Sequence, residues 1–408
     1  MSHSLPSQAG PASLSDPSSH SSGLIQSNDG EQPRPYRLHI KFTGSGSEYF
    51  RIWIVNMLLM MVTLGIYYPW AKVRRLRYFH GNTVIDGEPL GFHADPKKML
   101  KGYFLVGLMF SLYSAAGKFS AVAGLVAFLI VMAIWPALLK SSMQFRLANT
   151  SWRGMRFRFK GTVGGAYQAV MPLFVPSVVI LAAFAAVADP DKPPRWYLYT
   201  IVAVFALTVV VMPWLLWNLK KYQHNHYALA SLQTTFKASL ASFYGVFFKT
   251  LGVMLLPLVL AAVVIGGLFF LGKFGGMSNV AKGSLIVFIM GFGFVALLAS
   301  VFVLAKPYMT SRLQNLLWTR TGNTELRFKS DLRFKSLLWL SIKNWLLVVL
   351  TLGLYWPFAA VATARMRLEA VTVKMRQDPE LLISQIKASE GEAAGDAAGD
   401  LFGLDIGF

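Results

Sequence analysis

Two asparagines inside long apolar runs are the first residues in this sequence that could do chemistry. Asn56 and Asn344 occupy matching places, each the same distance before a proline. Two related amides that face each other could line a polar cavity on a pseudo-symmetry axis. An asparagine in a membrane helix also often hydrogen-bonds to a neighbouring helix and does nothing more. The sequence therefore predicts either a candidate polar cavity at these asparagines or a structural role for both.

A second set of candidate residues is basic and follows two of the apolar runs. The stretches predict interfacial helices that touch anionic lipid headgroups, so the expected partner is the lipid bilayer. The candidate headgroup contacts are Lys72, Arg74, Arg75, Arg77, Lys220 and Lys221. A specific anionic ligand is the less favoured alternative. No nucleic-acid partner is expected, because the basic excess of a membrane protein usually lies in its cytoplasmic loops.

Catalytic and metal chemistry are not indicated. The sequence has no cysteine, and His224 and His226 have no third ligand nearby. Motifs for phosphate loops, dinucleotide sites, nucleophile elbows and zinc proteases are missing. No acidic residue falls between Asp191 and Glu325, whereas coupled carriers commonly use intramembrane carboxylates. We therefore expect a protein that is not an enzyme and uses no cofactor or metal.

The elements that position these residues are predicted to be membrane helices. Hydrophobic residues make up 54% of the chain and charged residues 14%, with a net charge of +20, which is too apolar for a soluble protein. A helix needs about 20 mostly apolar residues to cross the membrane. Eight segments meet or approach this length: residues 49–70, 102–116, 121–139, 168–188, 197–217, 243–271, 284–305 and 337–358.

Composition also divides the chain into three parts. Residues 1–33 are rich in Ser, Pro and Gly and contain no apolar run, so they are predicted to form a disordered tail. Residues 34–375 hold every apolar segment and form the integral membrane domain. Residues 376–408 mix acidic residues with Ala and Gly and are predicted to form a flexible tail.

An internal repeat orders the segments. The stretch from Asn56 to Trp70 recurs from Asn344 to Phe358, and both copies contain Thr-Leu-Gly followed by Pro. Two shorter signatures recur as well, Phe-x-small at the start of a unit and Asn-Thr at its end. The Phe-x-small copies begin at Phe42, Phe92, Phe159, Phe236 and Phe328, and Asn-Thr occurs at Asn82, Asn149 and Asn323, with Asn225-His226-Tyr227 as a degenerate copy. These signatures predict about five units.

Short strands are predicted between the units. Asp86-Gly87 is a two-residue hairpin signal, and Arg153-Gly154 occupies the equivalent place before the alternating stretch 155–159. Because an isolated hairpin is only marginally stable, these strands would have to pack on one another or on lipid headgroups.

The distribution of Lys and Arg predicts the topology. The loops after the first, third, fifth and seventh segments carry 7, 6, 3 and 7 basic residues, and the others 1, 2 and 2, so the first set is predicted to be cytoplasmic. If residues 49–70 and 337–358 both cross, both tails lie outside, although their flanks are basic. Alternatively, both segments are re-entrant and turn back at Thr-Leu-Gly. The sequence leaves both readings open.

The chain resembles the YjgN family of bacterial inner-membrane proteins, domain of unknown function 898. The resemblance extends from about Tyr36 to Met375, and it departs from the family pattern at Ala359-Ala360, which replace a basic pair. It rests on Phe42-Thr43-Gly44, Tyr49-Phe50, Asn56, Thr63-Leu64-Gly65-Ile66-Tyr67, Pro69-Trp70-Ala71-Lys72 and Asn82-Thr83. The resemblance implies an inner-membrane location and the kind of fold, and no activity.

Together these observations predict an all-α polytopic protein of the cell inner membrane. Repeated transmembrane hairpins would supply six to eight membrane segments, joined by short cytoplasmic amphipathic or hairpin linkers. The leading functional hypothesis is a passive transporter or channel-like protein for an unidentified solute. The alternative is a membrane organiser that does not transport but binds anionic lipid or a partner protein through its basic loops.

Overall fold

The computed structural model describes residues 36–189, 191–229, 232–270 and 300–378, with isolated positions between 278 and 295 and at 380, 381 and 384. The predicted tail at residues 1–33 lies outside the described residues, as does most of the tail predicted at residues 376–408. Eight positions of the apolar segment 284–305 also lie outside them: 285, 286, 290, 292 and 296–299.

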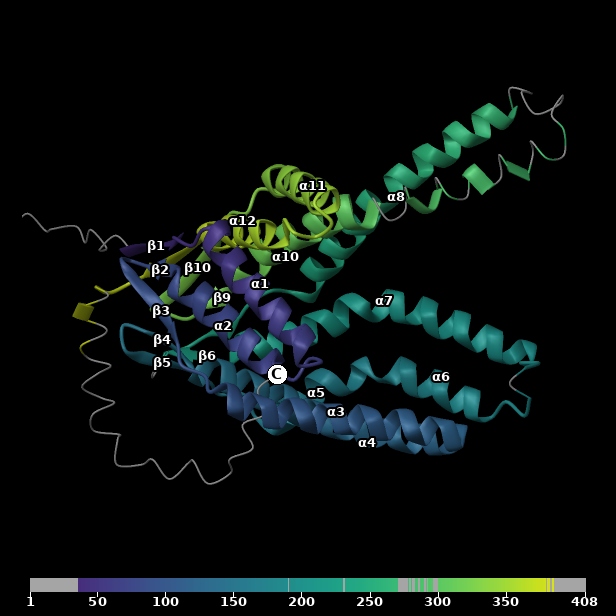
Figure 1. The fold of residues 1–408 in the computed structure, drawn as a ribbon, viewed down its shortest axis with the longest axis horizontal. Helices are drawn as coiled ribbons and strands as arrows, with labels where there is room; N and C mark the ends of the chain where they lie inside the picture. The colour runs from purple at the N-terminus through teal and green to yellow at the C-terminus, as the bar shows by residue number, and fades with distance from the viewer. Residues whose placement is uncertain are drawn as a thin grey trace, which may run out of the picture. The chain divides into compact units, whose positions relative to one another are not determined.

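The described elements form five groups, each of which opens and closes with a β-strand and holds helices between (Figure 1). The first two groups are β1 (Tyr36–Phe42), α1 (Gly46–Val62), α2 (Tyr68–Gly81), β2 (Thr83–Ile85); and β3 (Glu88–Phe92), α3 (Pro96–Phe119), α4 (Ala121–Ala148), β4 (Thr150–Trp152). The third is β5 (Met155–Phe159), α5 (Val163–Val170), the 3₁₀ turn η1 (Met171–Leu173), α6 (Val175–Ala185), α7 (Arg195–Asn225), β6 (Tyr227–Leu229). After β7 (Leu232–Gln233), the fourth is β8 (Thr235–Phe236), α8 (Leu240–Phe270), the π-helix η2 (Ser300–Ala305), α10 (Lys306–Thr319), β9 (Thr321–Gly322), and the fifth is β10 (Leu326–Ser330), α11 (Phe334–Leu350), α12 (Trp356–Glu369), β11 (Val371–Met375).

The strands of all five groups join in one antiparallel sheet that curls into a nearly closed barrel. Its order is β7-β6-β5-β4-β3-β2-β1-β11-β10-β9-β8. The two ends of this order, β7 and β8, are separated along the chain only by Thr234, whose N–H donates to the Tyr227 carbonyl at 2.8 Å. The sheet therefore leaves almost no free edge, which removes the unpaired backbone groups that would invite aggregation.

This barrel shows that the predicted all-α fold is wrong. The predicted hairpins are present: Asp86-Gly87 and Arg153-Gly154 both have positive φ and join strands that pair with each other. The linkers pack on one another to form the barrel. The sequence does not predict this barrel, because several strands are only two or three residues long and are too short to show alternating apolar and polar residues.

The predicted six to eight membrane segments are also too many for the described part of the chain. Four helices there are long and apolar enough to cross, within α3, α4, α7 and α8, and the pair α5-η1 and α6, bent by 53°, could form a fifth span. Among these, α3, α4, α6 and α7 lie side by side in Figure 1.

Residues 49–70 lie in a helical hairpin that returns to the barrel, because the strands on either side of them are paired with each other. α1 leaves β1, α2 returns to β2, and Phe42 of β1 is paired with Thr83 of β2. Residues 337–358 form the same arrangement, since Ser330 is paired with Val371. Of the two readings that the sequence left open, this hairpin geometry favours the re-entrant one at both places, and re-entry into the bilayer stays a prediction.

The Thr-Leu-Gly motif makes these two hairpins turn. In the first, Thr63 Oγ1 donates to the Leu59 carbonyl at 2.7 Å and accepts from the Tyr67 N–H at 3.0 Å. Gly65 has a φ of +89°, which glycine adopts at little cost, and its N–H donates to the Met60 carbonyl at 2.8 Å. The second hairpin repeats these bonds at Thr351 and Gly353. A hydroxyl thus satisfies backbone groups at an apolar tip, where unsatisfied groups are costly.

The Phe-x-small motif is structural as well. In the first four groups the phenylalanine ends the opening strand and is paired with the first residue of the closing strand. After Phe42, a Cβ on Gly44 would lie 2.8 Å from the Tyr78 hydroxyl, so only glycine fits without a shift. In the fifth group Ser330 holds the paired position. The predicted fifth copy at Phe328 therefore lies two residues before the corresponding position, and Phe328 is paired with Val373.

Every group begins and ends at the barrel, so all of its strands lie on one side of the membrane helices. The loops with the excess of Lys and Arg are those that contain strands β2 to β10. By the positive-inside rule we expect the barrel on the cytoplasmic side. Tyr36 at the start of β1 is paired with Met375 at the end of β11, so both ends of the membrane domain lie on that side.

Candidate functional site

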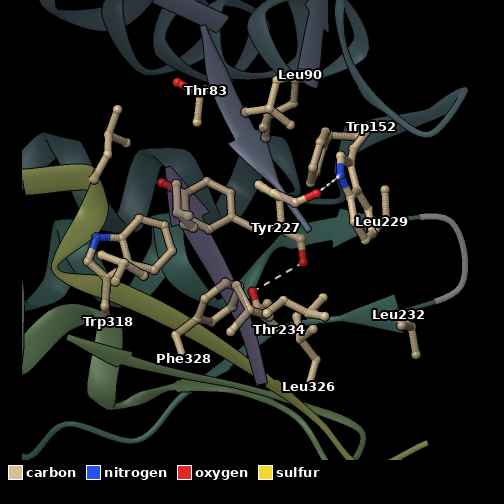
Figure 2. Close-up of a pocket in the computed structure, with 18 of the residues that line it drawn as sticks. Thr83, Leu90, Trp152, Tyr227, Leu229, Leu232, Thr234, Trp318, Leu326 and Phe328 are labelled. Carbon is tan, nitrogen blue, oxygen red and sulfur yellow. Dashed lines mark hydrogen bonds between the residues drawn. The ribbon is translucent and has the colours of Figure 1, made fainter. Parts of the chain in front are cut away.

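The lumen of the barrel holds a cavity of about 630 Å³. Side chains that point inward from the strands form its walls, and residues near the C-terminal ends of α4, α10 and α12 form one end. Figure 2 shows labelled residues from six strands and from α10 around this space. The polar lining residues are Thr83, Arg146, Tyr227, Thr234, Gln314 and Arg367, and every other lining side chain is apolar.

The lumen is apolar because apolar and polar residues alternate along the strands and the apolar ones point inward. Leu38, Ile40 and Phe42 of β1 are buried or half-buried, whereas Arg37, His39 and Lys41 are exposed. The inward residues meet in one core cluster around Leu38, Trp152, Met155, Val373 and Met375. Period-two alternation with one buried face is the expected pattern for such a strand.

Aromatic side chains shape the walls of the cavity. The Trp318 and Phe328 rings lie 5.1 Å apart between centroids. The Trp152 indole donates from Nε1 to the Ile85 carbonyl at 3.3 Å, so its only polar atom is used and its ring is left as an apolar surface. Large rigid rings with satisfied polar atoms suit contact with an apolar ligand.

The helix end of the lumen is cationic. Arg146 of α4 and Arg367 of α12 both line the cavity. Arg367 is held in place, because its Nε donates to Gln314 Oε1 at 2.8 Å and its carbonyl accepts from Gln314 Nε2 at 2.8 Å. Burial lowers the pKa of Arg367 below its usual value. The cavity therefore combines apolar walls with a charged end.

Two of the predicted headgroup contacts lie beside this end. Lys72 of α2 and Lys220 of α7 are half-buried, and their neighbours Val73 and Leu219 pack in the core clusters that contain Phe145 and Leu147, on either side of Arg146. Desolvation and the Arg146 charge lower the pKa of Lys72. Lys72 Nζ lies 5.8 Å from the centre of the Tyr68 ring, and Lys220 Nζ donates to Gln223 Oε1 at 2.9 Å.

The other predicted basic contacts do not line the lumen. Arg77 Nη2 donates to the Ala94 carbonyl at 3.1 Å. Arg75 lies over the Phe79 ring and Lys221 over the Trp217 ring, while Arg74 is exposed. Whether these side chains touch headgroups stays a prediction.

The structure places the predicted cavity residues Asn56 and Asn344 in separate hairpins, and neither lines the lumen. Asn56 is 6% exposed and its Nδ2 donates to the Ala71 carbonyl across its hairpin at 3.5 Å. Asn344 is 7% exposed and bonds the Ala359 carbonyl in the same way at 3.4 Å. These contacts match the structural role that the sequence offered as the alternative. His224 likewise bonds Thr321, and the described residues contain no metal-binding group of His, Asp and Glu.

Sequence reasoning missed the lumen residues. The alternation of Met155, Phe157 and Phe159 with arginines was visible, and it was the available signal for an inward apolar face. Arg146 lies ten residues after the buried helix proline Pro136, and Arg367 lies ten residues after Pro357. Aligning the units on these prolines would have revealed the shared position of the two arginines.

Comparison with known proteins agrees with this inner-membrane architecture. The chain is 23% identical to the inner membrane protein YjgN of Salmonella typhimurium over 341 residues, which is 78% of this chain and 84% of that protein. It is 28% identical to the inner membrane protein YjgN of Escherichia coli K12 over 125 residues, 30% of this chain and 31% of that protein. No solved structure matches. The family model described as bacterial protein of unknown function (DUF898) matches residues 37–401. With four helices able to span a membrane, the chain is an inner-membrane protein that belongs to the DUF898 family.

Proposed function

We propose that this protein binds an amphipathic molecule whose apolar chain lies in the barrel lumen. The observation that carries the proposal is the cavity of about 630 Å³ with almost wholly apolar walls. Its size falls within the range of about 300 to 1,000 Å³ that is usual for small-molecule sites. Removing apolar surface from water provides the driving force. A lipid is the natural candidate, since the cavity belongs to a protein of the bilayer.

The composition of the lumen favours binding over conduction. A pathway for ions or polar solutes needs groups that replace the solute's hydration shell. Most of the lining residues cannot do this, since six of them are polar and the rest are apolar. We therefore propose a binding protein that is not an enzyme. This proposal is nearer to the lipid-binding alternative considered from the sequence, but it places the ligand in the lumen and not on the basic loops.

Passive transport of an unidentified solute is the second candidate. The cations Arg146 and Arg367 at the helix end favour an anionic solute for such a pathway. We also propose that the five groups descend from one repeated unit, since strand, helices and strand recur in the same order. Protein-dependent uptake of inorganic phosphate into reconstituted vesicles would support transport and count against the binding proposal.

Quenching of tryptophan fluorescence tests the binding proposal. Purified full-length protein in detergent is titrated with a brominated long-chain alcohol, which quenches tryptophans that it touches. Trp152 and Trp318 line the lumen, and we expect a saturable loss of fluorescence from these two. The double variant Trp152→Phe, Trp318→Phe should lose that saturable part.

Trp339→Phe is the matched control, because Trp339 is 69% exposed on α11 and does not line the lumen. It should leave the saturable part unchanged. Size-exclusion chromatography and thermal unfolding check that each variant is folded. A folded double variant that is quenched as strongly and saturably as the original protein contradicts the proposal.

A further inference from the structure

Two arginines line the helix end of the lumen, and two lysines lie near one of them. Arg146 and Arg367 line the cavity. Val73, next to Lys72, shares a core cluster with Phe145, and Leu219, next to Lys220, packs on the same cluster as Leu147, so both lysines lie close to Arg146. Among the described residues, the ion pairs found are those of Arg153, and none involves these four cations.

The donors of this cluster are largely unused. Arg367 is oriented through its Nε by Gln314, and no described acceptor takes a bond from its two terminal nitrogens. Lys220 bonds one amide oxygen, that of Gln223. Gln314 is only 6% exposed, so it holds the Arg367 fork rigidly at the cavity wall. A rigid fork with free terminal N–H groups is the arrangement that binds oxyanions in a bidentate manner.

Like charges brought together in a partly desolvated place repel one another strongly. Burying cations without partners costs free energy unless an anion joins them. A carboxylate carries one negative charge, whereas a phosphate monoester carries about 1.5 to 2 and three acceptor oxygens. Four cations with several free donors match the phosphate monoester better.

We propose that Arg146, Arg367, Lys72 and Lys220 bind the phosphate monoester headgroup of the amphipathic molecule whose chain fills the lumen. This inference rests on the proposed function, because the apolar cavity supplies the site for the chain. The headgroup sits at the helix end and the chain extends into the barrel among the aromatic side chains (Figure 2).

Three probes with full-length protein in detergent separate the parts of the proposal: dodecyl phosphate, dodecanol and inorganic phosphate. Binding is measured by tryptophan fluorescence and by calorimetry. We expect dodecyl phosphate to bind roughly tenfold to a hundredfold more tightly than dodecanol, the range set by one or two charge-assisted hydrogen bonds. Inorganic phosphate alone should compete only weakly, since it lacks the chain.

Charge-removing variants locate the headgroup site. Arg146→Gln with Arg367→Gln should bring the affinity for dodecyl phosphate down to that for dodecanol, while dodecanol binding and thermal unfolding stay close to those of the original protein. The matched control is Arg37→Gln with Lys374→Gln, which removes the same charge from two paired positions on the outward side of β1 and β11. It should leave both affinities unchanged.

Each other outcome is decisive. Equal binding of dodecyl phosphate and dodecanol by the original protein overturns the headgroup site and leaves the proposed function standing. Failure of both probes to bind overturns the proposed function itself. Inorganic phosphate that binds as tightly as dodecyl phosphate means a site for free phosphate, not a headgroup. An equal loss in the Arg37 and Lys374 control means a diffuse effect of net charge, and this too overturns the proposal.

Discussion

Single cysteines at the tips of the two short hairpins should be unreachable from either side of the membrane. Leu64 and Leu352 are 93% and 95% exposed in the protein itself. Large apolar side chains this exposed at the tips of apolar hairpins are expected to face lipid. Substituting them one at a time with cysteine tests whether residues 49–70 and 337–358 turn back inside the bilayer.

Helix lengths give the expected depth. α1 has 17 residues and at 1.5 Å per residue is about 26 Å long, whereas α3 has 24 residues and is about 36 Å long. Both helices start close to strands of the same barrel. The hydrocarbon core is about 30 Å thick. The tip at Leu64 should therefore stop about 10 Å short of the level that α3 reaches, inside the hydrocarbon.

The assay is clean because the natural sequence has no cysteine. Leu64→Cys and Leu352→Cys are exposed to a membrane-impermeant maleimide in intact cells and in inside-out vesicles, and we expect labelling only after detergent is added. Lys192→Cys, between α6 and α7, should be labelled from outside. Lys374→Cys, on the outward side of β11, should be labelled in inside-out vesicles. Labelling of Leu64→Cys in intact cells would refute the re-entrant hairpin.

Three further predictions concern the hairpin and its base. Thr63→Val removes the bond to the Leu59 carbonyl and the acceptor of the Tyr67 N–H, so unfolding in detergent should become easier by about 1 to 2 kcal/mol. Thr200→Val, which removes only a bond to the Trp196 carbonyl on an exposed helix, should cost less, and an equal cost would contradict the special role of the tip. Gly65→Ala forces alanine to a φ of +89°, and we expect it to lower the free energy of unfolding by about 1 to 2 kcal/mol. Its control, Gly107→Ala, lies in open space on α3 and should be neutral or stabilising. A larger loss of stability in Gly107→Ala than in Gly65→Ala would rule out backbone strain at Gly65. Desolvation, and then the hydrogen bond to Glu48, raise the pKa of Tyr78 to about 12. A raised pKa in the folded state means that the contribution of Tyr78 is present below about 10 and lost as the pH rises from 10 to 12. The gap in thermal stability between the original protein and Tyr78→Phe should therefore narrow above pH 10, and a constant gap would argue against this ionisation.

Local signals in the sequence predicted the parts of the fold that local chemistry decides. The turns at Asp86-Gly87 and Arg153-Gly154 need a left-handed backbone conformation, and the glycine in each pair predicts it. The length of the apolar runs predicted the membrane helices. The re-entrant alternative followed from a mismatch between the basic residues that flank the tails and the number of segments, and the pairing of the flanking strands favours it.

The barrel and its lumen could not be predicted in this way. β9 has two residues, and its partners come from 85 positions earlier in β8 and from β10, so no window of sequence contains the pairing. Arg146 and Arg367 lie more than 200 residues apart in the sequence and become neighbours of one cavity only when the ring closes. Asn56 and Asn344 drew attention because polar residues stand out in apolar runs, yet in each the amide nitrogen donates to a backbone carbonyl of the next helix.

Because Tyr36 is paired with Met375, the first and last strands of the barrel are neighbours, and no strand is its structural start. A short linker between these two residues would close the chain into a circle without crossing another element, and the circle could be cut at the exposed turn Asp86-Gly87 or at Arg153-Gly154. Each such circular permutant would keep the strand order and present the five groups in rotated sequence order. The order in which groups enter the membrane during synthesis is thus separable from the order in which they stand around the barrel.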